Sequence, residues 1–298
     1  MYADSTSPLK PVLIACAGIA LYSTMDVLMK GLSISMGAYN AVIWRTTAGT
    51  VLCGIAYAAM RPTWPNRATM VIHFVRSIFV AAMAFFFFWG LARLPMAEAI
   101  SLAFIAPLLA IFMAAIFLGE AVDRRSIIAA LMGFAGVVVI VIGKLGASKH
   151  APDALLAVAA VSISALCYAA NLILARKQAK MAGPLEIAFY QNVFVTLILG
   201  LAAPWFLVVP SLSDAIPIVS AAAMAVLSLM LLTWAYARAQ TQILVTTEYT
   251  GFLWAMFYGW VFFQESVTLS TLIGAGLIVT ACLYVTRPAK AAAQPVTA

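Results

Sequence analysis

The sequence has little charge, few cysteines and few histidines. Only 9% of its 298 residues are Asp, Glu, Lys or Arg, whereas a soluble globular domain has about 25%. This shortage excludes a soluble enzyme and a disordered chain. The four cysteines stand singly within apolar stretches and no Cys-x-x-Cys pair occurs, so we expect neither a disulfide framework nor a metal site, and no cofactor.

Sequence motifs of membrane-embedded catalysis and of ATP-driven pumping are also absent. The chain has no HExxH motif, no cluster of histidines and no GxxxxGK[ST] phosphate loop. An enzyme is therefore not expected. Nucleic-acid binding is not expected either, although the net charge is +7, because the Lys and Arg residues lie mostly in short gaps between apolar runs, as topology signals do.

Long apolar runs dominate what is present. Hydrophobic residues make up 65% of the chain and the mean hydropathy is +1.06. Each run has about 20 residues, which is enough for a helix to cross the hydrocarbon core, and backbone groups in lipid must be satisfied within the segment. We predict an all-α integral membrane protein with ten spans, at residues 9–31, 38–60, 68–91, 96–119, 125–143, 152–175, 184–209, 215–238, 243–264 and 269–286.

The distribution of basic residues predicts the orientation of these spans. With the N-terminus inside, the inner gaps and tail hold eleven Lys and Arg residues and the outer gaps hold four, while Arg45 and Arg76 fall within spans. This bias favours a multi-pass protein of the plasma membrane with both termini, including the tail 287–298, in the cytoplasm.

The chain repeats itself at an offset of 145 to 146 residues. Residues 89–93 (WGLAR) match residues 234–238 (WAYAR), and the same offset places Glu120 on Glu265. We therefore predict two repeats, 9–143 and 152–286, within one transmembrane domain. Because each repeat has five spans, the second one starts on the opposite side of the membrane, and such inverted repeats are typical of secondary transporters with alternating access.

The residues at the end of the fourth span carry a family resemblance. Leu118-Gly119-Glu120, followed by a short loop and the Gly-rich fifth span around Gly133 and Gly136, resembles the EamA unit. Two such units make the ten-helix transporters of the drug/metabolite transporter superfamily, among which the chain most resembles the YddG-type amino-acid exporters. The resemblance implies a bacterial inner-membrane exporter with a central cavity lined by helices three, four, eight and nine, with one and six.

Polar and aromatic positions on those helices predict a substrate path. Binding pockets are mostly apolar with a few polar anchors, although each of these side chains taken alone is better explained by packing or lipid contact. The predicted path residues are Tyr22, Met25, Phe79, Met83, Ser101, Phe104, Tyr168, Asn171, Ser228, Trp234, Tyr249 and Trp254.

Five ionisable residues within the spans are candidate proton or ion-pair sites, because charge inside a bilayer is expensive. Asp26 and Lys30 share a helix face, which allows either an ion pair between them or a substrate-amine site at Asp26. Glu248 offers a proton or ammonium site or an interfacial pair with Arg238, whereas Arg45 and Arg76 offer carboxylate binding or pairing with an acid. Pro107 and Gly251 are candidate hinges of helices four and nine.

Together these features predict a secondary transporter that exports small metabolites, with aromatic and large neutral amino acids as the leading substrates. Proton-coupled efflux of lipophilic cations is the alternative, and it requires a carboxylate that is accessible near the middle of the membrane. The expected partners are a small-molecule substrate and the lipid bilayer. The sequence leaves the coupling ion and the oligomeric state open.

Overall fold

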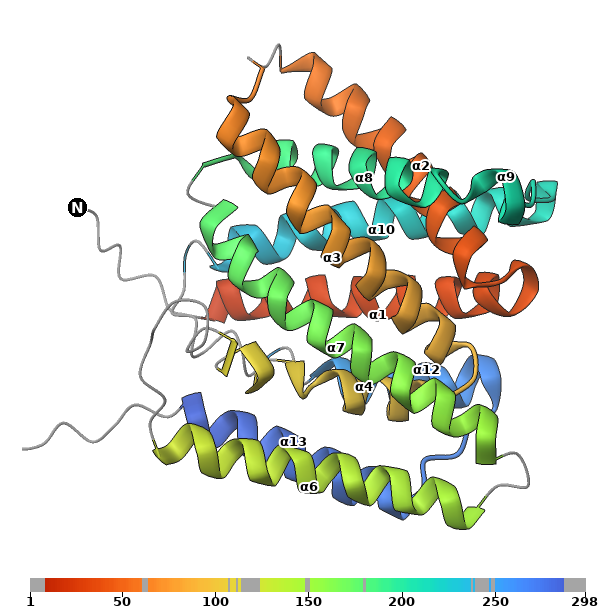
Figure 1. The fold of residues 1–298 in the computed structure, drawn as a ribbon, viewed down its shortest axis with the longest axis vertical. Coiled ribbons are helices and arrows are strands. Elements are labelled where there is room, and N and C mark those ends of the chain that lie inside the picture. Colours follow the sequence, from red (N-terminus) through yellow and green to blue (C-terminus); the bar gives the residue numbers. More distant parts are fainter. Residues whose placement is uncertain are drawn as a thin grey trace, which may run out of the picture.

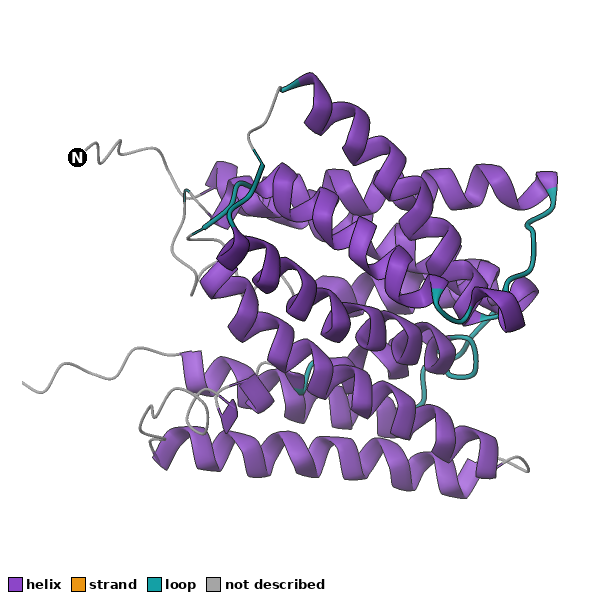
Figure 2. Cartoon of the chain, turned by 45° about the horizontal axis from the view of Figure 1, so that its top comes forward, coloured by secondary structure: helices purple, strands orange, loops and turns teal. Residues whose placement is uncertain are grey.

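A computed structural model describes residues 9–60, 64–106, 108–110, 112–113, 124–147, 151–178, 181–236, 238, 247 and 250–286. Every regular element in these ranges is a helix (Figures 1 and 2), which confirms the predicted all-helical class. The helices are α1 (Leu9–Met36), α2 (Ala38–Ala59), α3 (Arg67–Leu91), α4 (Met96–Ala103), α6 (Arg124–Ala147), α7 (Ala151–Gln178), α8 (Pro184–Gly200), α9 (Ala203–Phe206), α10 (Leu212–Tyr236), α12 (Thr250–Phe263) and α13 (Leu269–Thr286).

Local sequence explains several helix boundaries. Gly37 adopts a φ of 82°, a left-handed conformation that suits glycine, and so turns the chain from α1 into α2. The side chain of Asn66 accepts a hydrogen bond of 2.9 Å from the Thr69 N–H and thereby caps α3. Pro184 occupies the first turn of α8, where its missing N–H costs nothing.

The predicted spans 96–119 and 184–209 are both interrupted in the structure, the first after Ala103, where α4 ends. The run at 184–209 was expected to form one helix, but α8 ends at Gly200 and the short α9 ends at Phe206, after which the backbone is extended. The extended stretch is tied to α2, because Val208 N–H donates to the Asn40 side chain (2.8 Å) and Val208 C=O accepts from the Trp44 indole (2.8 Å). These long-range bonds replace the helical bonds that the sequence predicts.

The helices pack in pairs that join distant parts of the chain. In Figure 1, α1 lies along α10, α3 along α7, and α6 along α13, and α2 and α4 contact α8 and α12 respectively. Glycines permit two of these close approaches. A Cβ on Gly136 of α6 would lie 2.6 Å from the Gly274 carbonyl of α13, and one on Gly90 of α3 would lie 2.5 Å from Val161 of α7.

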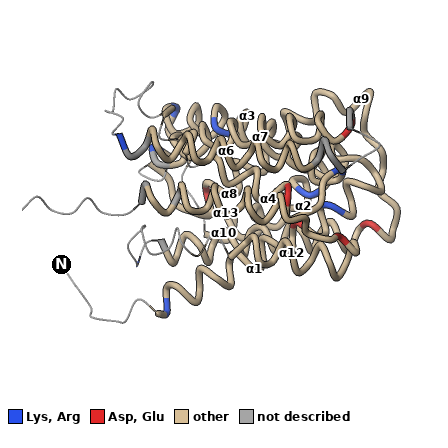
Figure 3. The backbone as a smooth tube through the Cα atoms, turned by 90° about the horizontal axis from the view of Figure 1, so that it is seen from below, with Lys and Arg blue, Asp and Glu red and all other residues tan. Residues whose placement is uncertain are grey.

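The outer surface of this bundle is apolar. Four described helices, at Leu9–Met36, Arg67–Leu91, Asp153–Ala175 and Leu212–Ala235, are long and apolar enough to cross a membrane, and several shorter apolar helices accompany them. Large side chains such as Leu131 (66%) and Trp260 (67%) remain exposed, and most of the backbone tube in Figure 3 carries no charge. Such a surface is stable in lipid and not in water.

Candidate functional site

Three polar side chains come together between α1 and α2. Tyr22 and Asp26 of α1 interact electrostatically with Arg45 of α2, and all three keep part of their surface accessible. Among the described residues Asp26 has no hydrogen bond or direct ion pair, and the buried Nε of Arg45 has no hydrogen-bond partner. The carboxylate and the guanidinium are therefore neighbours that leave hydrogen-bonding capacity for a further molecule.

Arg76 of α3 lies beside this group and is held by neutral amides. Its Nε donates to Asn171 Oδ1 at 2.7 Å, and its Nη1 donates to Gln178 Oε1, both on α7. Arg76 also interacts electrostatically with Tyr22 and Tyr168. Asn171 was predicted to lie on the substrate path, and its described partner is the predicted carboxylate-binding residue Arg76.

A chain of hydrogen bonds fixes the orientation of Gln178. Its side-chain N–H donates to His73 Nδ1 at 2.5 Å, which leaves the imidazole proton on Nε2, where it faces Glu186 Oε1 at 3.2 Å. His73 is also stacked on Tyr190, with ring centroids 5.0 Å apart. Since Gln178 is fixed through its amide nitrogen, its oxygen is directed at Arg76.

The sequence analysis missed the roles of His73, Gln178 and Glu186. A signal was available for the first two, because His73 stands three residues before Arg76, and Gln178 stands seven residues after Asn171. Both spacings place side chains on one helix face. The contact with Glu186 depends on how α8 packs on α3, which no local pattern specifies.

Lys30 is paired in a different way from the sequence expectation. It forms an ion pair with Glu265, not with Asp26, and its ammonium group also donates to the Leu94 carbonyl at 2.7 Å. The other oxygen of Glu265 accepts from the Met96 N–H at 2.7 Å. This contact joins α1, the link before α4 and the link after α12, so the ion pair stabilises a corner between three segments.

Several predicted path residues lie in the packed interior. Met25 is buried in the core, the Ser101 hydroxyl donates to Ala97 C=O at 2.5 Å, and the Ser228 hydroxyl donates to Gly18 C=O at 2.6 Å. Met83 and Phe104 pack partly buried against the core. In this conformation both serine hydroxyls therefore donate to backbone carbonyls within the packed interior.

The predicted aromatic residues occupy different surroundings. Trp234 stacks under the Arg238 guanidinium at 4.2 Å and lies near Lys10 at 5.9 Å, as is typical of a membrane-interface tryptophan. Trp254 stacks on Tyr258 with centroids 5.6 Å apart, and Phe79 is half-buried on α3. Gly251 is buried, and a Cβ added to it would lie 3.6 Å from the Ile19 side chain. Pro107, Glu248 and Tyr249 lie outside the described residues.

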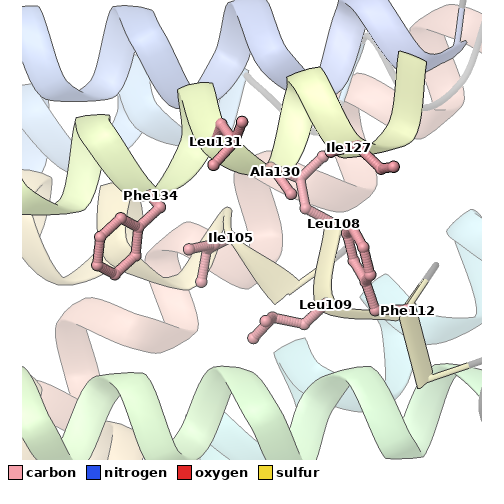
Figure 4. Close-up of a pocket in the computed structure, with 8 residues that line it drawn as sticks. All are labelled: Ile105, Leu108, Leu109, Phe112, Ile127, Ala130, Leu131 and Phe134. Atoms are coloured by element: carbon pink, nitrogen blue, oxygen red, sulfur yellow. The ribbon is translucent and has the colours of Figure 1, made fainter. Parts of the chain in front are cut away.

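An apolar hollow of about 390 Å³ lies elsewhere, between α6 and the segment after α4 (Figure 4). Every described side chain that lines it is apolar. These side chains offer no group that would recognise a charged or polar substrate. Its lining residues are Ile105, Leu108, Leu109, Phe112, Ile127, Ala130, Leu131 and Phe134.

The chain is similar to known transporters along nearly its whole length. The profile described as the EamA-like transporter family matches residues 9–142 and 155–287. The pseudopaline exporter CntI of Pseudomonas aeruginosa is 28% identical, with 94% of this chain and 96% of the exporter covered. A riboflavin transporter of Rhizobium johnstonii is 27% identical, with 91% of this chain and 88% of that protein covered.

An amino acid exporter and a solved structure are also similar to the chain. The aromatic amino acid exporter YddG of Ancylobacter novellus is 26% identical over 59% of this chain and 60% of its own length. A solved crystal structure superimposes with a TM-score of 0.59 at 21% identity, covering 94% of this chain and 97% of the other. At that identity the superposition supports a shared fold alone.

Proposed function

The chain belongs to the EamA-like transporter family, and from this premise we propose that it exports an amino acid or a similar small metabolite by alternating access. The resemblance to this family in the sequence is confirmed. The family and the relatives are transporters, so the prediction that the chain is not an enzyme is confirmed as well.

The proposed architecture is ten spans in two inverted repeats, 9–143 and 152–286. Sequence equivalence pairs α1 with α7, α2 with α8, α3 with α10 and α6 with α13. Exchanging the repeats then turns the contact of α1 with α10 into that of α7 with α3, and the contacts of α2 with α8 and of α6 with α13 into themselves. This correspondence supports a two-fold relation between the repeats, the basis of alternating access.

The neighbouring Asp26 and Arg45 carry the proposal for the substrate. A free amino acid has an ammonium group and a carboxylate on one carbon. Asp26 would take the ammonium and Arg45 the carboxylate, because each has bonding capacity unused by described residues. Tyr22 lies beside both and adds a hydroxyl and an aromatic face. Around these anchors, the predicted path residues would contact the rest of the substrate.

Direction and location follow from the charge bias and the resemblance. We place the protein in a bacterial inner membrane with both termini in the cytoplasm. The resemblance to exporters supports outward transport. Pro107 and Gly251 remain the candidate hinges. The two halves would swing about them while the site stays fixed.

The test is transport by the purified full chain in liposomes. Labelled aromatic, large neutral and acidic amino acids are loaded, and release is followed with and without a pH gradient. We expect saturable flux of at least one amino acid without a gradient, and an Asp26→Asn variant should lose most of it. Absence of amino-acid flux under every condition would overturn the proposal.

Asp26 also supports a second candidate, proton-coupled efflux of lipophilic cations. A carboxylate without a described partner can exchange a proton for a cation. The same liposomes distinguish the two candidates. Movement of a lipophilic cation driven only by the pH gradient, with no amino-acid flux, would establish the second and replace the first.

A further inference from the structure

The described side chains around Tyr22 of α1 include more positive than negative charges. Two guanidinium groups, Arg45 and Arg76, interact with Tyr22, whereas Asp26 is the carboxylate that interacts with it. Of the other described charges, Lys30 pairs with Glu265, and the buried Glu98 accepts from the Thr271 hydroxyl at 3.4 Å. Neither Lys30 nor Glu98 is among the groups that interact electrostatically with Tyr22, Arg45 or Arg76. The described site therefore has one more positive than negative charge.

The partners of Arg76 leave its charge in place. Asn171 and Gln178 accept its hydrogen bonds through neutral amide oxygens, which orient the guanidinium without neutralising it. Glu186 lies at the far end of the hydrogen-bond chain through His73, in the first turn of α8, where the helix dipole favours a negative charge. It does not act as an electrostatic partner of Arg76.

An uncompensated cation inside a membrane protein is expensive, and a bound anion relieves that cost. On the basis of the proposed function, we infer that the substrate carries a second anionic group and that Arg76 binds it. The ammonium and first carboxylate would engage Asp26 and Arg45. The substrate class is then an amino acid derivative with an additional carboxylate or phosphate, in place of a neutral aromatic amino acid.

Gln178 is a positioning residue in this scheme. It holds Arg76 through one end of its amide, and His73 holds the other end. A carboxylate at this position would pair directly with Arg76 and cancel its charge. Loss of folded protein lowers the flux of every substrate equally. The ratio of anionic to neutral substrate flux therefore reports the charge at Arg76 independently of the amount of folded protein.

The experiment compares matched pairs of amino acids in liposomes that contain the full chain. One pair is L-glutamate and L-glutamine, and the other is O-phospho-L-serine and L-serine, so the arms distinguish a carboxylate from a phosphate. Flux is measured at low concentration, where it reflects kcat/KM. We expect the wild type to prefer the anionic member of at least one pair by about tenfold or more, since a hydrogen bond to a charged group is typically worth that much.

Two variants test the assignment to Arg76. Arg76→Gln removes the cation, and Gln178→Glu neutralises it while keeping the side chain's shape; each should bring the preference close to one. Asn66→Asp is the matched control, because it makes the same amide-to-carboxylate change at the exposed cap of α3. It should keep the wild-type preference.

The experiment distinguishes failure of the inference about Arg76 from failure of the proposed amino-acid transport. A wild type that transports glutamine and serine as well as their anionic counterparts overturns the inference and leaves the proposed function standing. Unchanged preference in folded Gln178→Glu also overturns it. Absence of flux for every amino acid overturns the proposed function itself.

Discussion

Asp26 and Lys30 stand one turn apart on α1, yet their surroundings differ completely. Lys30 is 3% exposed, pairs with Glu265, donates to the Leu94 carbonyl and lies 4.9 Å from the centre of the Phe263 ring. Asp26 keeps accessible surface and has no described hydrogen bond or ion pair. One helix thus carries a charge that is paired within the fold and a charge that the proposed substrate would bind.

The difference teaches how to assign charged residues in a membrane protein. A buried ion pair whose remaining hydrogen-bonding capacity is also satisfied is costly to break and gives a substrate nothing to bind. A charge that faces a neighbour without a direct bond costs stability but can be matched by a ligand. The Lys30 corner and the Asp26–Arg45 site are the two cases, and variants at each should affect different measurements.

The largest expected effect is on stability, at the Lys30 corner. Glu265→Gln leaves the Lys30 ammonium buried without its counter-charge, and breaking a buried pair typically costs about 3–5 kcal/mol. The free energy of unfolding of the purified protein in detergent measures this loss. A Lys30→Met/Glu265→Gln double variant should recover part of it, because no charge is then left unpaired. Stability of Glu265→Gln equal to the wild type would show that the Lys30–Glu265 pair does not stabilise the fold.

This corner also shows where prediction from the sequence ends. Apolar runs and helix breakers predicted some helix bounds closely: the tenth predicted span, 269–286, has the same bounds as α13, whereas α4 and α8 end inside the spans predicted for them. Glu265 lies 235 residues from Lys30, so its role depends on how α1 packs against the link after α12. The sequence offered Asp26 as the partner because only local spacing was visible.

The polar site was predictable to a greater extent. Asp26, Arg45, Arg76 and Asn171 were candidates because polar side chains inside a membrane span are rarely accidental. The structure adds which of them meet: Arg76 with Asn171, and Arg45 near Asp26. These contacts depend on the rotation of α2, α3 and α7 about their axes, which the long and nearly uniform apolar runs specify weakly.

The next effect in size is on transport, at Arg45. Arg45→Gln should lower amino-acid flux about 10- to 100-fold, because a charge-assisted bond to the substrate carboxylate is lost. The unfolding temperature should change little, since the Arg45 guanidinium has no described hydrogen bond to lose. Flux and unfolding are measured on the same preparation.

Arg93→Gln provides the matched control for Arg45. Arg93 is exposed and stacks on Trp89 at 3.7 Å, away from the site, so the same substitution there should leave flux within about twofold of the wild type, as exposed contacts of this kind are weak. Equal flux in Arg45→Gln and Arg93→Gln would show that Arg45 does not bind the substrate.

The smallest expected effect is on stability, at a contact of α1 that lies close to the Asp26–Arg45 site. The Thr24 and Tyr258 hydroxyls are 2.9 Å apart and connect α1 to α12, two residues before Asp26. Tyr258→Phe removes this bond and keeps the ring, so we expect a stability loss of about 0.6 kcal/mol, the average for such bonds in membranes, and nearly unchanged flux. That result would show that the Tyr258 hydroxyl stabilises the packing of α1 on α12 and does not contact the substrate. A large loss of flux at unchanged stability would instead extend the substrate site along α12, since the hydroxyl would then act on the substrate and not on the helix contact.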